Sequence, residues 1–180
     1  MKFKHWIPLI GLSLVGCGTS KPPLDLVDAV DLERYQGTWY EIAKLPNRFQ
    51  DQCVADTRAR YRLLDDGAVE VTNRCRLRSG ETESITGRAR RPDPDQPAAL
   101  EVRFAPGWLS WLPLIWGDYQ VMALDDAYRS ALVGEPSREF LWILSRTPGL
   151  ARERIDELLA EAERQGFPVE RIDFTPQDEA

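Results

Sequence analysis

Eight short strand-like segments, separated by tight turn signals, constrain the fold more than any other feature of this sequence. Turn signals such as Asp65-Asp66-Gly67, Ser79-Gly80 and Gly134-Glu135-Pro136 interrupt the strand-like runs. Eight strands joined mostly by tight turns suit an up-and-down barrel, because closure removes the unpaired edges of the sheet. The sequence therefore predicts an all-β fold, an eight-stranded antiparallel up-and-down β-barrel. The expected strands are residues 37–45, 53–64, 68–78, 82–91, 99–104, 117–125, 128–134 and 139–146.

Alternation within these segments predicts which side of the barrel each residue faces. In the segment 53–64, small or apolar residues such as Ala59 and Tyr61 alternate with Arg58, Arg60 and Arg62. The charged set cannot face lipid, because an arginine at the bilayer midplane costs about 2–4 kcal/mol. The sequence therefore predicts a barrel with an apolar interior and a charged exterior in water.

One α-helix is expected after the last strand of the barrel. Ile155, Leu158 and Ala162 recur at helical spacing, and Gly166 with Pro168 ends the run. The charged residues between them are mixed or acidic, so this helix is predicted to pack on the outside of the barrel rather than on a membrane. A short final strand is expected over residues 169–174.

The N-terminal stretch resembles a bacterial lipoprotein signal peptide. Lys2 and Lys4 precede an apolar run over residues 6–15, which is too short to span a bilayer. Leu14-Val15-Gly16-Cys17 resembles a lipobox, which implies cleavage after Gly16 and lipidation of Cys17; an ordinary signal peptide is the alternative. By the same resemblance, Gly18 favours sorting to the outer membrane, on its periplasmic side. We expect a signal peptide at 1–16, a lipidated tether at 17–31 and a barrel domain at 32–180.

Charge and histidine content exclude several classes of function. The stretch 1–16 contains two lysines and no acid, so the rest of the chain has 21 basic and 29 acidic residues and a net charge of −8. Such a balance argues against nucleic-acid binding. The single histidine, His5, lies in the expected signal peptide, which removes histidine-dependent catalysis and ordinary zinc sites. We therefore expect no catalytic residue, metal or cofactor.

Two cysteines remain after Cys17 is assigned to the lipid. Cys53 and Cys75 flank the turn at Asp65-Asp66-Gly67, so they lie near one level of a hairpin and point the same way. In an oxidising compartment this favours a disulfide, which stabilises a loop of this length by about 3 kcal/mol. Two buried thiols are the alternative.

The residues expected to face inward leave room for a ligand. Ala55, Thr57, Ala59, Gly87 and Ala89 are small, whereas a filled core would use leucine and isoleucine there. An apolar hollow suits a hydrocarbon chain, at about 0.8 kcal/mol for each buried methylene. The polar members of the set could bind the polar head of a ligand or form hydrogen bonds with one another. The predicted cavity residues are Ala55, Thr57, Tyr61, Val71, Asn73, Leu100, Val102, Phe104, Tyr119, Val121 and Trp142.

The uncharged segment 106–116 carries three tryptophans, Trp108, Trp111 and Trp116. It connects the fifth and sixth expected strands, at the open end of the barrel. An exposed patch of this kind marks a contact surface. It could contact a membrane, cover the cavity or form a homodimer interface. Alternatively, the loop folds back into the barrel mouth and forms part of the core.

Two motifs in the chain resemble those of the lipocalin family. The first is Gly37-Thr38-Trp39-Tyr40-Glu41, and the second is Ile143-Leu144-Ser145-Arg146-Thr147-Pro148. Arginine over tryptophan is a strong cation–π pair, and the resemblance implies that Arg146, Trp39 and Gly37 close the base of the barrel. The segment 124–128 resembles a further family motif. The match is similar to the bacterial and apolipoprotein D branch, which implies binding of fatty acids and lysophospholipids and a role in membrane upkeep.

The sequence is consistent with three functions. The main hypothesis is a non-catalytic lipoprotein, anchored through Cys17 to the outer membrane, that stores or transports single-chain lipids. The second is a lipocalin-fold enzyme, for which Glu41 and Glu83 are the inward-facing acids. The third is a scaffold with a filled barrel whose tryptophan-rich loop recruits a partner.

Overall fold

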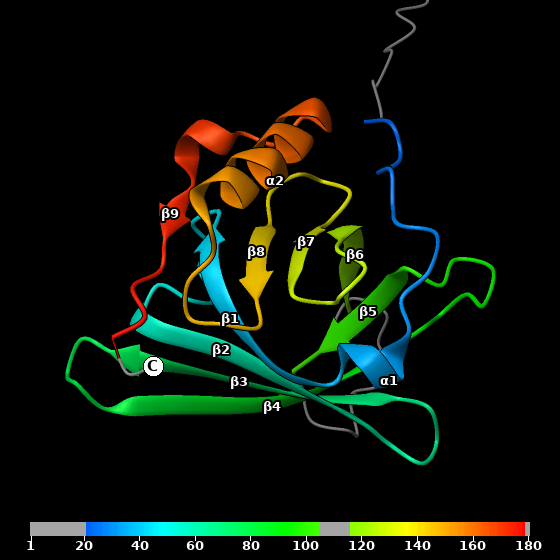
Figure 1. The fold of residues 1–180 in the computed structure, drawn as a ribbon. Helices are drawn as coiled ribbons and strands as arrows, with labels where there is room; N and C mark the ends of the chain where they lie inside the picture. The colour runs from blue at the N-terminus through cyan, green and yellow to red at the C-terminus, as the bar shows by residue number, and fades with distance from the viewer. Residues whose placement is uncertain (1–20, 105–115, 179–180) are drawn as a thin grey trace, which may run out of the picture.

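The computed structural model describes residues 21–104 and 116–178 of the chain, which form a closed antiparallel β-barrel (Figure 1). The hydrogen-bonded order is β2-β3-β4-β5-β6-β7-β8-β1-β9, and β1 also pairs with β2, which closes the ring of eight strands. The eight strands are β1 (Gly37–Lys44), β2 (Cys53–Leu63), β3 (Val69–Leu77), β4 (Thr82–Arg90), β5 (Ala99–Arg103), β6 (Gly117–Leu124), β7 (Ser130–Gly134) and β8 (Leu141–Ser145). The predicted fold class is confirmed.

Strand β7 begins two residues later than the sequence analysis predicted. Asp125 Oδ1 accepts hydrogen bonds from the backbone N–H groups of Arg129 and Ser130, at 2.7 and 2.5 Å. Tyr128 adopts a positive φ of 57°, which lies outside the range of a regular strand. These bonds hold residues 125–129 in a turn, and the strand starts at Ser130.

Bulges in β2 break the alternation from which its inward residues were predicted. The register with β3 shifts twice, between Cys53 and Ala55 and again between Ala55 and Arg58. Asp56 carries the second irregularity with a φ of 54°. Ala55 consequently pairs with Arg76 and does not line the barrel interior, so its prediction as a cavity residue was wrong.

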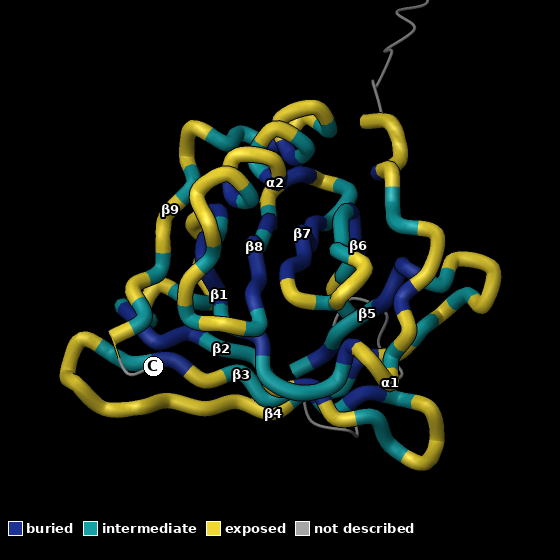
Figure 2. Tube along the Cα trace, viewed as in Figure 1, coloured by how far each residue is buried: buried dark blue, intermediate teal, exposed yellow. Residues whose placement is uncertain are grey.

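The expected C-terminal helix packs on the outside of the barrel. Helix α2 (Arg152–Arg164) buries Ile155, Leu158 and Ala162 against the outer face of β1, β7 and β8 (Figures 1 and 2). Beyond it, a Cβ on Gly134 would lie 2.6 Å from the ring of Phe167, so this close approach requires glycine. The predicted final strand is shorter than expected: a 3₁₀ turn (Val169–Arg171) precedes β9 (Asp173–Phe174).

The segment before β1 belongs to the barrel domain rather than to a free tether. Leu24 and Val30 are buried, and the Val27 N–H donates to the Val121 carbonyl at 3.0 Å. A short helix that was not predicted, α1 (Leu32–Tyr35), follows, with Asp31 as its N-cap. The expected domain start at residue 32 was therefore too late.

Arg146 and Trp39 close one end of the barrel, as expected from the family motifs. The Arg146 guanidinium lies 4.1 Å from the centroid of the fully buried Trp39 ring. Its three nitrogens donate to the carbonyls of Tyr128, Thr38 and Arg34 at 3.1, 3.1 and 2.7 Å. Gly37 has a φ of 96°, and a Cβ there would lie 3.0 Å from Arg146 Nη1. Both the backbone conformation and the arginine therefore require glycine at this position.

We predict that Arg146→Lys lowers the free energy of unfolding by about 2–3 kcal/mol, because one ammonium cannot serve three diverging carbonyls. Urea denaturation measures the change. Arg129→Lys is the matched control, since Arg129 is exposed and makes one ion pair, with Asp125 at 3.6 Å; its expected effect is within about 0.5 kcal/mol. Equal effects of the two substitutions would contradict the role of Arg146.

Candidate functional site

The interior of the barrel contains a cavity of about 770 Å³. This volume falls within the range of about 300–1,000 Å³ that is typical of small-molecule sites. Ten of the eleven predicted cavity residues line it, and only Ala55 does not. These ten are Thr57, Tyr61, Val71, Asn73, Leu100, Val102, Phe104, Tyr119, Val121 and Trp142.

Gly87 does not create the empty volume that its small size suggested. A Cβ on Gly87 would lie 2.4 Å from the Arg103 carbonyl oxygen and 2.6 Å from the Phe104 ring. The glycine therefore allows the Phe104 ring to pack against β4, and Phe104 takes the place that a side chain at 87 would occupy. The cavity lies beside this ring, which is part of its wall.

Three tyrosines meet at the closed end of the cavity. Tyr119 Oη lies 2.9 Å from Tyr35 Oη and 3.0 Å from Tyr61 Oη. Burial raises the pKa of Tyr61 to about 12, and it raises the pKa values of Tyr35 and Tyr119 further above the ordinary value. All three hydroxyls therefore keep their protons at neutral pH. We call Tyr35, Tyr61 and Tyr119 the tyrosine cluster.

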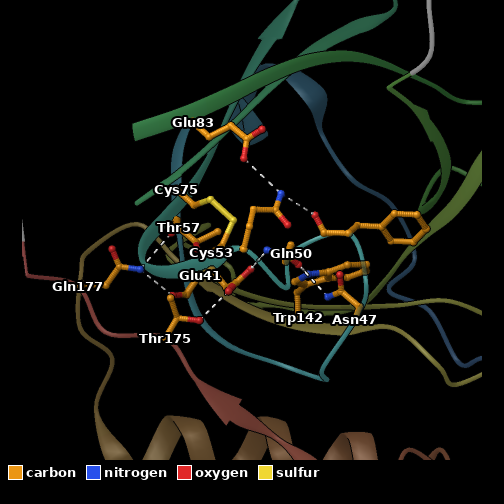
Figure 3. The surroundings of a disulfide bond; sticks show 12 residues. Glu41, Asn47, Gln50, Cys53, Thr57, Cys75, Glu83, Trp142, Thr175 and Gln177 are labelled. Atoms are coloured by element: carbon orange, nitrogen blue, oxygen red, sulfur yellow. Dashed lines mark hydrogen bonds between the residues drawn. A yellow bond between two sulfur atoms is a disulfide. The ribbon is translucent and has the colours of Figure 1, made fainter. Parts of the chain in front are cut away.

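A second polar group lies near the open end, in the wall between β1 and β2 (Figure 3). Glu41 is only 3% exposed. Its carboxylate accepts hydrogen bonds from Gln50 Nε2 and Thr175 Oγ1, both at 2.6 Å. Gln50 Oε1 in turn accepts from Asn47 Nδ2 and Trp142 Nε1, at 2.9 and 3.0 Å. This network joins the β1–β2 loop, β8 and the C-terminal segment.

The same geometry bears on the alternative of catalysis. Glu41 and Glu83, the two inward acids named from the sequence, both line the cavity. Each oxygen of Glu41 is occupied by a protein donor, and Glu83 Oε2 accepts from Gln52 Nε2 at 3.3 Å. No group of three or more histidine, cysteine or acidic residues within residues 21–104 and 116–178 is arranged to hold a metal. Both acids are therefore engaged in hydrogen bonds within the protein.

The C-terminal segment closes a gap between β1 and β2 that the sequence analysis did not foresee. The two strands pair through only four residue pairs, the last being Tyr40 with Arg58. Beyond that point β9 pairs with β1 instead, and Gln177 Nε2 donates to the carbonyls of Glu41 and Thr57 at 2.8 and 3.0 Å. Figure 3 shows Gln177 between the two strands. A segment of isolated polar residues such as this carries no periodicity from which its position could be read.

The predicted disulfide is confirmed. Cys53 and Cys75 are bonded, with their Cα atoms 5.6 Å apart, and both residues line the cavity (Figure 3). The bond joins β2 to β3 at the place where the first bulge loosens their pairing. It therefore ties the cavity wall beside this shift in register.

Of the tryptophan-rich segment 106–116, only Trp116 lies among the described residues. Trp108 and Trp111 lie outside the described residues, so the roles expected for them stay predictions. Trp116 packs under two arginines, with the guanidinium carbons of Arg90 and Arg103 at 4.0 and 4.9 Å from its ring centroid. It also borders the cavity.

An aromatic group at the open end was missed in the sequence. Phe49 is 61% exposed, and its ring lies 5.7 Å from that of Phe140, which stacks on Trp142 at 6.1 Å. Ile85 is another cavity residue that is 50% exposed. The signal was present as an isolated phenylalanine in the turn after β1, but single exposed apolar residues are common and carry little weight alone. In the described parts of the chain, no helix combines the length and apolarity that crossing a bilayer requires.

Comparison with known proteins gives a consistent result. A model of the family described as "Lipocalin-like domain" matches residues 30–177. Temperature-induced lipocalin-1 of Arabidopsis thaliana is 40% identical over 163 residues, which cover 89% of this chain and 87% of that protein. Outer membrane lipoprotein Blc of Escherichia coli (strain K12) is 38% identical over 167 residues, covering 91% and 90% of the two chains. Apolipoprotein D of Mus musculus is 31% identical and covers 87% and 80%.

Solved structures agree on the fold. Insecticyanin from the tobacco hornworm Manduca sexta superposes with a TM-score of 0.70 over 88% of this chain and 86% of that one, at 23% identity. At this identity the likeness concerns the fold alone.

We predict that the stability of the protein depends on pH through Glu41. Burial raises the pKa of this carboxyl above its ordinary value of 4.5, against the opposing effects of Thr175, Gln50 and Lys44. A raised folded-state pKa means that the stabilising contribution is complete below 4.5 and is lost as the pH rises toward the folded-state value. Chemical denaturation between about pH 4 and pH 8 should therefore show Glu41→Gln gaining stability over the wild type as the pH rises. Glu153→Gln, at an exposed position, controls for net charge. A stability difference between the wild type and the Glu41→Gln variant that stays constant across the range would refute the prediction.

Proposed function

The chain belongs to the lipocalin-like family, and from that premise we propose that it binds single-chain lipids, such as fatty acids or lysophospholipids, and stores or transports them at the outer membrane. The observation that carries the proposal is the cavity of about 770 Å³ inside the barrel. Its middle section is walled by apolar side chains, including Val71, Leu100 and Val121. Each methylene buried there contributes about 0.8 kcal/mol before ordering costs, so an acyl chain suits this space. A scaffold protein with a filled barrel would not contain such a cavity.

The names of the bacterial relatives support anchoring at the outer membrane. Relatives from Escherichia coli and Citrobacter freundii, each 38% identical, are outer membrane lipoproteins by name. In this chain the matching feature is Cys17 after Leu14-Val15-Gly16. We propose that Cys17 carries the lipid anchor and that the domain lies on the periplasmic side.

The course of the N-terminal segment suggests how the cavity lies relative to that anchor. Lys21 Nζ donates to the Ser137 carbonyl at 2.5 Å, and the Pro22 carbonyl accepts from Arg138 Nη2 at 2.7 Å. Residues 135–140 join β7 to β8 at the open end, level with Lys44 at the end of β1. Cys17 precedes Lys21 by four residues, which span at most about 14 Å. An anchor at Cys17 therefore favours an orientation in which the mouth of the cavity faces the bilayer.

Val102 lines the cavity, so the substitution Val102→Trp would fill part of it with an indole ring. We predict that this variant binds fatty acid and lysophospholipid at least about tenfold more weakly. Displacement of a cavity-bound fluorescent fatty acid measures the loss. Ala160→Trp, at an exposed position of α2, is the control and should leave the affinity unchanged. Circular dichroism verifies that both variants fold. Unchanged binding by a folded Val102→Trp variant would argue against the cavity as the lipid site.

We also predict that Cys17→Ser moves the protein from the outer-membrane fraction to the soluble periplasmic fraction, because the thiol that accepts the lipid is gone. Cell fractionation and mass spectrometry of the N-terminal peptide measure this. Ser20→Ala in the same stretch should leave both the lipid and the location unchanged. Membrane retention of the Cys17→Ser protein would contradict the anchor.

A further inference from the structure

The hydrogen-bonding capacity of the tyrosine cluster is not fully used within the protein. Each of its three hydroxyls has one proton to donate, and burial keeps all three protonated. Two hydrogen bonds join them, Tyr35 to Tyr119 and Tyr61 to Tyr119. Whichever way these bonds run, they use two protons and leave one. No acceptor for the third proton occurs among the residues that the structure describes.

The unused proton lies at the closed end of the cavity. All three tyrosines line the cavity, and Tyr35 and Tyr61 are only 4% and 8% exposed. A buried donor without a partner costs about 1–3 kcal/mol, which is a reason for the site to favour a ligand that supplies an acceptor. Three convergent hydroxyls among apolar neighbours such as Val71, Leu100 and Val121 also fix where that acceptor must lie.

We propose that the ligand bears a neutral oxygen, a hydroxyl or carbonyl, at the end of its chain that lies deepest in the barrel, and that this oxygen accepts a hydrogen bond from the tyrosine cluster. The inference rests on the proposed function of lipid binding and narrows its ligand class.

The surroundings favour a neutral oxygen over a carboxylate. Three arginines lie near the closed end, Arg34, Arg91 and Arg146, and none of them lines the cavity. Arg146 is a cation that acts on Tyr35 and Tyr61, and its three nitrogens already donate to backbone carbonyls. A carboxylate at the cluster would be desolvated among neutral hydroxyls without a cation in contact, and such burial is strongly unfavourable. A neutral hydroxyl or carbonyl needs only the one donor that is available.

The test compares two ligands that differ only at the far end of the chain, hexadecanoic acid and ω-hydroxyhexadecanoic acid. Competition against a fluorescent fatty acid gives the affinity of each for the wild type and for the triple variant Tyr35→Phe/Tyr61→Phe/Tyr119→Phe. Removing all three hydroxyls together leaves no orphaned partner, so the fold should survive. Tyr40→Phe, on the opposite side of the barrel wall, is the matched control.

We expect the wild type and the Tyr40→Phe protein to bind the ω-hydroxy chain more tightly than hexadecanoic acid. In the triple variant this affinity ratio should be about tenfold smaller. If both ligands bind and their affinity ratio is the same in all three proteins, the inference is wrong. A water molecule then accepts the hydrogen bond from the third hydroxyl. If neither ligand binds the wild type, the proposed function itself fails.

A second measurement does not depend on the triple variant. In wild-type protein labelled with ¹³C at tyrosine Cζ, the ω-hydroxy chain should shift resonances of the cluster more than hexadecanoic acid does. Assignment uses the single variant Tyr61→Phe. Equal shifts with both ligands would overturn the inference.

Discussion

The shape of the barrel depends on the strands with which β1 pairs. One edge of β1 pairs with β8 from Tyr40 to Lys44, whereas the other edge pairs with β2 through only four residue pairs. Beyond Tyr40 the two strands separate, and the C-terminal segment hydrogen-bonds to both of them. The barrel is therefore closed by direct pairing at the Trp39 end and by an added segment near the mouth. At one end the strands are paired directly, and at the other end β1 and β2 are joined through the C-terminal segment.

The polar groups of the cavity follow from the same asymmetry. At the directly paired end, α1 brings Tyr35 under the barrel, and its ring stacks on Trp39 at 4.7 Å. Its hydroxyl reaches Tyr119 on β6, so three hydroxyls gather where the strands converge. At the other end, the separation of β1 and β2 leaves Glu41 without a strand neighbour on the β2 side, and Thr175 and Gln50 satisfy its carboxylate instead. Apolar side chains fill the wall between these two places.

The sequence predicted those parts of the structure that repeat, and it missed those that occur once. Alternation and turn signals located all eight barrel strands to within two residues, and helical spacing located α2. Ala55 was misplaced because the bulge at Asp56 interrupts the period of two, and a bulge leaves no mark in the residue pattern. The bridging by Gln177 depends on a single amide that meets two carbonyls from distant strands, which no local pattern can encode.

The same distinction applies to the candidate site. The inward residues of regular strands, such as Val71 and Leu100, were identified because burial follows period two. Tyr61 and Tyr119 were identified as polar members of the interior, but their meeting with Tyr35 required the unpredicted helix α1. Sequence patterns thus located the apolar wall, whereas the polar contacts at its two ends depend on tertiary structure.

The position of the mouth and the chemistry of the closed end constrain each other. An amphiphile in a leaflet presents its oxygen-bearing end to a protein held at the membrane surface. In the proposed orientation, with the mouth toward the bilayer, the mouth would meet that end first, and the tyrosine cluster at the far end of the cavity would offer a donor to a small neutral oxygen. A lipid with a large charged head cannot enter this way, because its charge would be desolvated in the apolar middle of the barrel. Under the proposal, the head of such a lipid would stay at the mouth, where Arg48 and Phe49 line the cavity, and only a chain with a second oxygen at its tip could reach the cluster. Under the proposed function, the two ends of the cavity would together select for the length of the chain and for the group at its tip.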